Sequence, residues 1–82
     1  MNNEYYIAKG KLSDYQKQYE QIEMRADAML IQIRELLNPT NDLLEFNVDL
    51  IFDLAKQFRE MQLTARDLLK KIEQIKNTYN IS

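Results

Sequence analysis

The feature that most constrains the fold of this 82-residue chain is a heptad repeat of apolar residues with a single break. In the first half, apolar side chains recur at intervals of three and four residues, at Tyr5, Ala8, Leu12, Tyr15, Tyr19, Ile22, Ala26, Met29, Ile33 and Leu36. The rhythm returns at Leu44, Asn47, Ile51, Leu54, Phe58, Met61, Ala65, Leu68, Ile72, Ile75 and Tyr79, where Asn47 alone is polar. A strand would need strict alternation, which neither segment shows. The pattern therefore predicts two long helices, each with an apolar stripe, here called the seam.

The break between the two stripes has the sequence Asn38-Pro39-Thr40-Asn41-Asp42. Pro39 disfavours helical geometry at Asn38 and has no N–H to donate, so the first helix should end there. Residues 40–42 are all favourable N-cap residues, and Asp42 with Glu45 has the spacing of a capping box. We therefore predict a single domain, residues 1–82, with a helix over about 3–38, a turn over about 38–42 and a helix over about 42–79.

Folding the chain at residue 40 makes the helices antiparallel and sets their stripes face to face. Tyr15 then lies opposite Ala65, and Met29 opposite Ile51. A heptad repeat fits equally well after a shift of seven residues, so this register depends on centring the fold at residue 40, inside the only break that contains a proline. The sequence predicts an all-α fold, an antiparallel two-helix hairpin that resembles a coiled coil. The central ten positions of this predicted hairpin seam are Tyr15, Tyr19, Ile22, Ala26, Met29, Ile51, Leu54, Phe58, Met61 and Ala65.

Apolar residues outside the seam gather near the break, and two helices alone bury little surface. These residues form a predicted interaction surface of Leu30, Leu37, Leu43, Phe46, Val48, Leu50 and Phe52. They favour association with further copies into a helical bundle, so the predicted partner is a homo-oligomer. Docking of a different protein is the alternative reading of the same surface.

The residue types argue against catalysis. The chain has no Cys and no His, which removes thiol and imidazole chemistry and the usual zinc ligands. Glu45, Asp49 and Asp53 recur at every fourth position, as paired acid–base or cation-binding carboxylates would. Acids at a helix N-terminus also complement the helix dipole, and this structural role is the favoured one. We expect no enzymatic activity, no cofactor, no metal and no small-molecule substrate.

Charge and hydropathy limit the other partners. Thirteen acids against eleven bases make this an acidic small protein with net charge −2, which argues against nucleic acid. No stretch approaches the roughly 20 apolar residues of a membrane span, and residues 1–25 hold no apolar run typical of a signal peptide. The expected location is the cytoplasm, or outside the cell without a cleavable signal peptide if the chain belongs to a secretion apparatus.

The turn and the second helix carry a resemblance to a known group. The run Leu36-Leu37-Asn38-Pro39-Thr40-Asn41, followed by Leu43-Leu44, resembles the helix–turn–helix region of type III secretion needle subunits. With a one-residue gap, Arg59, Gln62, Lys70 and Ile72 match residues of some needle subunits. Asp42 stands where needle turns often have a second proline, and the polar end over residues 77–82 differs from their apolar or aromatic ends. The regular seam is equally similar to small hairpin chaperones of secretion systems.

Two classes of function follow. The first is a non-enzymatic protein–protein interaction and assembly module, such as a secretion-apparatus subunit or a small hairpin chaperone. The alternative is a small regulator, such as a phage-type inhibitor, an immunity protein or an antitoxin, that binds and blocks a partner protein. A finite homo-oligomer would favour the first class, and one-to-one binding that inactivates an enzyme would favour the second.

Overall fold

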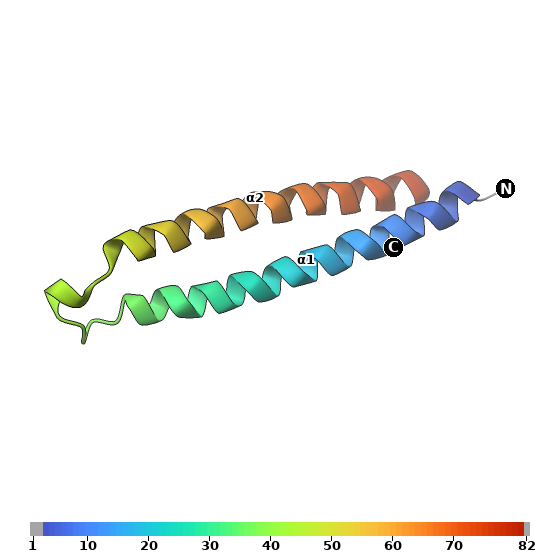
Figure 1. Ribbon diagram of the computed structural model, residues 1–82. Helices are drawn as coiled ribbons and strands as arrows, with labels where there is room; N and C mark the ends of the chain where they lie inside the picture. The colour runs from blue at the N-terminus through green and yellow to red at the C-terminus, as the bar shows by residue number, and fades with distance from the viewer. Residues whose placement is uncertain (1–2, 82) are drawn as a thin grey trace.

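The computed structural model describes residues 3–81, so residues 1, 2 and 82 of the predicted domain lie outside it. Two long helices, α1 (Asn3–Leu36) and α2 (Val48–Tyr79), are joined by a segment that contains a short 3₁₀-helix, η1 (Leu43–Glu45). The long helices lie side by side and run in opposite directions (Figure 1). No strand occurs among the described residues. The predicted all-α helical hairpin is therefore confirmed.

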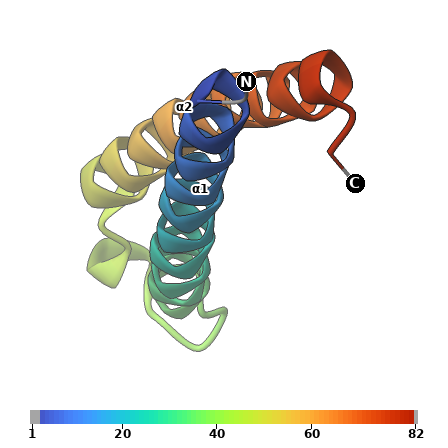
Figure 2. The same ribbon diagram turned by 90° about the vertical axis from the view of Figure 1, so that its right-hand side faces the viewer.

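The hairpin is a thin rod with principal extents of 66 × 15 × 15 Å. The connecting segment forms one end of the rod, here called the turn end, and the two chain termini lie toward the other, the terminal end (Figure 1). A view along the rod shows that the helices cross at an angle (Figure 2). Such a crossing keeps the 3.5-residue repeat of one stripe in contact with the other over many turns.

The first helix ends slightly before its predicted end at about residue 38. The last helical residue is Leu36. The amide of Asn38 donates a hydrogen bond to the carbonyl of Glu35, three residues back, at 3.3 Å, as in a 3₁₀ turn. The side-chain oxygen of Asn38 accepts hydrogen bonds from the amide and the hydroxyl of Thr40, at 3.0 and 2.9 Å. Asparagine thus closes a local turn around Pro39, which cannot continue the helix.

The second helix begins later than predicted, at Val48 and not near residue 42. The amide of Asp42 does donate to the Glu45 carboxylate at 3.3 Å, but the resulting helical turn is only η1. Phe46 then adopts an extended backbone with ψ 117°, and its side chain is half-buried. The N-cap of α2 is Asn47, whose side-chain oxygen accepts from the amide of Leu50 at 3.1 Å. The chain gains the burial of Phe46 and a second cap by interrupting the helix here.

This later start removes two positions from the predicted seam. Leu44, the first position of the second stripe, lies in η1 and is 95% exposed. Asn47, the next position of that stripe, caps α2 and is also exposed. Both predictions were wrong for one reason: the heptad rhythm continues through a segment that is not helical, so the rhythm there places no side chain between the helices.

The core lies where the remaining seam positions meet. All ten seam positions of α1, from Tyr5 to Leu36, are buried or half-buried, and so are the nine of α2 from Ile51 to Tyr79. Leu30, Leu50 and Lys76 are the further residues of the two helices with reduced exposure. Among the described residues, five side chains are buried: Ala8, Leu12, Leu54, Leu68 and Ile72. Four of these five lie toward the terminal end, so that end is the better packed.

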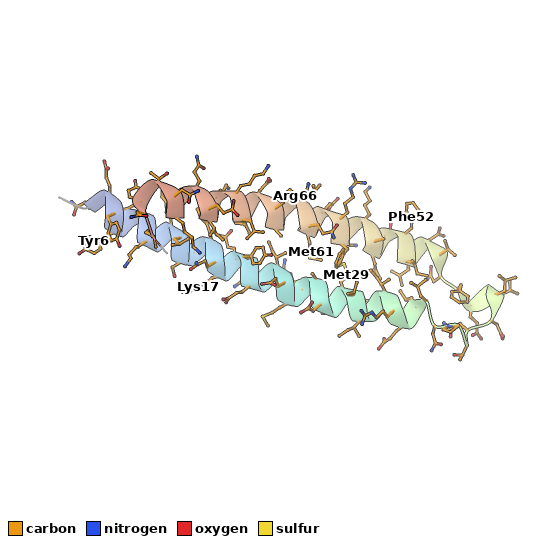
Figure 3. All side chains as sticks on the ribbon, turned by 180° about the vertical axis from the view of Figure 1, so that it is seen from behind. Tyr6, Lys17, Met29, Phe52, Met61 and Arg66 are labelled. Atoms are coloured by element: carbon orange, nitrogen blue, oxygen red, sulfur yellow. The ribbon has the colours of Figure 1, made fainter. Side chains whose placement is uncertain are left out.

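The register between the helices differs from the prediction. The ammonium of Lys71 lies 5.5 Å from the Tyr15 ring centre, and Met29 lines one groove together with Met61. Met29 and Met61 point toward each other between the helices (Figure 3). Tyr15 was predicted opposite Ala65 and Met29 opposite Ile51, so α2 is displaced by about one heptad, roughly 10 Å along its axis. The longer connection causes this shift, because it moves the centre of the fold beyond residue 40.

Candidate interaction surface

The predicted interaction surface is mostly uncovered in the single hairpin. Val48 is 64% and Phe52 72% exposed, and Phe52 points away from α1 (Figure 3). Leu43 is 87% exposed, and Leu37 is exposed as well. We call these exposed residues, together with Leu44, the turn-end patch: Leu37, Leu43, Leu44, Val48 and Phe52. A group of large apolar side chains left in water at one end of a small protein is typical of a contact surface.

The other three predicted surface residues are partly covered within the chain. Leu30, Phe46 and Leu50 are all half-buried. Leu30 follows the seam residue Met29, and Leu50 precedes Ile51, so both flank the seam and contribute to the hairpin contact itself. Phe46 lies in the extended segment between η1 and α2. The structure thus divides the predicted surface into an exposed patch and three residues that support the turn.

Leu37 of the patch lies on the side of the hairpin that carries a groove in the terminal half. Leu37 directly follows the seam residue Leu36, and Leu69 holds the same place after Leu68. Positions of this kind face each other across an antiparallel pair. They line a groove of about 440 Å³ in the terminal half, formed by Gln16, Tyr19, Glu20, Glu23, Leu69, Ile72 and Lys76. We call this the terminal groove and the side that carries it the patch side.

The opposite side of the hairpin has a different lining. Its groove of about 660 Å³ lies at mid-length and has Met29 and Met61 among its lining residues. Its other lining residues are Ile22, Arg25, Ala28, Gln32, Gln57, Glu60 and Thr64. Charged and amide side chains flank both grooves, and the mid-length groove has Ile22, Ala28, Met29 and Met61 as its apolar lining.

Charge is distributed unevenly along the rod. Five acids and no base lie between residues 35 and 55: Glu35, Asp42, Glu45, Asp49 and Asp53. Four bases and two acids lie between residues 66 and 81: Arg66, Asp67, Lys70, Lys71, Glu73 and Lys76. The turn end is therefore strongly acidic, and the last third of α2 is basic. The acids of the turn end are all exposed.

These acids do not form a metal centre in the described structure. Within residues 3–81, no group of three or more metal-binding side chains is arranged to hold an ion. Asp49, at the start of α2, lies in the first helical turn, where a negative charge complements the helix dipole.

Among the described helices, none has the length and apolar character needed to cross a membrane.

In comparisons with known proteins, no family model, no curated protein and no solved structure matches the chain.

Sequence reasoning missed several exposed apolar side chains. Leu69 is 41% exposed on the patch side, and its place directly after a seam residue, shared with Leu30 and Leu37, was the available signal. Leu44 was assigned to the seam because it continued the heptad rhythm. Met24 and Leu63 are also exposed, on the outer faces of the helices.

Proposed function

We propose that this chain is a non-catalytic protein–protein interaction module that assembles through the apolar surface at the turn end of its hairpin. The observation that carries this proposal is the turn-end patch. Leu43 and Leu44 are adjacent and almost fully exposed, and Val48 and Phe52 continue the apolar surface onto α2. Removing such surface from water is the main driving force of protein association.

The modest packing of the hairpin supports the same proposal. Five side chains are buried, and none of the described residues has a side chain that is fully enclosed. The mid-length seam positions, such as Ala26 and Phe58, are half-buried. A partner that covers these positions would add burial that two helices cannot supply to each other.

Two finer roles fit this module. An assembly subunit or a hairpin chaperone would use the patch to bind further copies or a secreted partner. A small regulator would use it to block another protein, and the acidic turn end favours a target with a basic surface. Both roles work by contact, and neither requires a nucleophile or an acid–base pair.

The experiment that tests this proposal replaces Phe52 with the photo-crosslinking residue benzoylphenylalanine in cells that make the protein. Phe52 is exposed, so the substitution should leave the hairpin intact. The matched control carries the same residue at Lys17, which is exposed on the outer face of α1 (Figure 3). Irradiation is followed by mass spectrometry of the crosslinked product.

The proposal expects a defined adduct from position 52 and none from position 17. An adduct with a second copy indicates an assembly subunit, and an adduct with a different protein indicates a chaperone or a regulator. If position 52 yields no more product than position 17, the turn-end patch contacts nothing in the cell. That result would overturn the proposed function.

A further inference from the structure

We propose that the partner on the patch side is a second copy of this chain, packed alongside in the opposite direction. The turn-end patch of each copy then covers the terminal groove of the other. This inference rests on the proposed function and names the occupant and its orientation. Two properties of the hairpin carry it: its dimensions and its charge distribution.

The dimensions favour a contact along the rod over a contact between ends. A side of 66 by 15 Å offers on the order of 1,000 Å² to a partner, close to the roughly 800 Å² per partner of a standard interface. An end of 15 by 15 Å offers only a few hundred Å², which is the range of weak contacts. Two hairpins side by side would form a four-helix bundle, in which each helix has two neighbours.

The charge distribution decides the direction. A parallel pair would place the five acids of one turn end beside the same five acids of the other, and like charges in contact are unfavourable. An antiparallel pair places these acids beside the terminal end, where the bases Arg66, Lys70, Lys71 and Lys76 are offset by Glu20, Glu23, Asp67 and Glu73. The electrostatic term therefore favours the antiparallel pair, because it separates the two acidic turn ends.

Two-fold symmetry sets the register of the antiparallel pair. In a symmetric dimer, surface i contacts surface j and surface j contacts surface i. On α2, the patch residue Phe52 and the groove residue Leu69 are about 25 Å apart along the helix axis. A two-fold axis that passes midway between them, near Met61, lays each patch on the groove of the other copy. Phe52 of one copy then lies beside Leu69 of the other.

Single cysteines test this arrangement, because the natural chain has none and every disulfide must join two chains. The variants are Phe52→Cys and Leu69→Cys, both at exposed positions that the hairpin does not need. Mixed and mildly oxidised, they should give a disulfide-linked dimer. Each variant alone should remain largely uncrosslinked. Phe52→Cys mixed with Lys17→Cys, on the outer face of α1, is the control and should also remain uncrosslinked.

Salt dependence provides a second test on the natural chain. In the antiparallel pair the five acids of one turn end lie apart from those of the other, so the dimer dissociation constant should change little between about 0.05 and 0.5 M sodium chloride. Analytical ultracentrifugation measures this constant. A parallel dimer would associate more tightly in salt, since screening relieves repulsion between the two turn ends.

Several outcomes would overturn the inference. Crosslinking of Phe52→Cys with itself, together with tighter association in salt, would show a parallel dimer. A folded chain that stays monomeric at all concentrations would show that the second copy is not the occupant. In that case the photo-crosslink from position 52 in cells still decides the proposed function, because it detects any protein that covers the patch.

Discussion

Gly10 is the one residue of α1 whose backbone weakens the helix without any structural need. It lies in the helix interior, and a Cβ added there would meet nothing within 4 Å. Glycine loses more backbone entropy than alanine when a helix forms. Gly10→Ala should therefore raise the free energy of unfolding by about 0.5–1 kcal/mol, measured by urea denaturation at a fixed protein concentration. A decrease in stability would show that this part of α1 makes a contact that requires glycine.

Asn47 decides where α2 begins. Its side-chain oxygen accepts a hydrogen bond from the amide of Leu50, one of the helix amides that would otherwise lack a partner. Asn47→Ala should lower the free energy of unfolding by about 1 kcal/mol, as loss of an N-cap typically does. Asn47→Asp is the matched control, because aspartate is an equally good cap and should restore most of the stability. Equal losses in both variants would contradict a capping role.

At the scale of the helices, the sequence predicted what local repeats determine. The stripe from Tyr5 to Leu36 and the stripe from Ile51 to Tyr79 are the positions that the structure covers, because a 3.5-residue period must face a partner along its whole length. The connection was predicted less well. Asp42 and Glu45 form a real local contact, yet the burial of Phe46 and the cap at Asn47 end that turn early. Asp42 and Asn47 are competing N-caps for the second helix. Which of them is used depends on how Phe46 packs, and the local sequence does not reveal that packing.

The register was missed for a related reason, since a heptad repeat permits any shift of seven residues. Lys71 lies over the Tyr15 ring, and Ile72, the next residue, is buried. We therefore expect Tyr15 to lie beside Ile72, one heptad beyond Ala65. In a double variant, Tyr15→Cys with Ile72→Cys should form a disulfide within one chain. Tyr15→Cys with Ala65→Cys should form none, as measured by mobility on a gel under dilute, mildly oxidising conditions. The reverse result would restore the fold centred at residue 40.

At the scale of the whole molecule, stability and association are coupled. The rod is only 15 Å across, so most seam side chains reach solvent at their edges, and the buried ones are concentrated toward the terminal end. The turn half has one buried side chain, Leu54, and carries the whole turn-end patch. The half with the weaker core is thus the half that offers the larger apolar surface to a partner. Covering that surface would stabilise the part of the hairpin that needs it more.

This coupling predicts that thermal stability depends on protein concentration. For a protein that unfolds from a dimer, a tenfold rise in concentration contributes about 1.4 kcal/mol per dimer. Shared between two chains of this length, that free energy raises Tm by about 3–5 °C. The double variant Val48→Glu with Phe52→Glu should keep its helix content, because both side chains are exposed in the single hairpin, but its Tm should be lower and independent of concentration. Circular dichroism at three concentrations distinguishes the two proteins. A natural chain whose Tm does not change with concentration would show that the hairpin folds without a second copy.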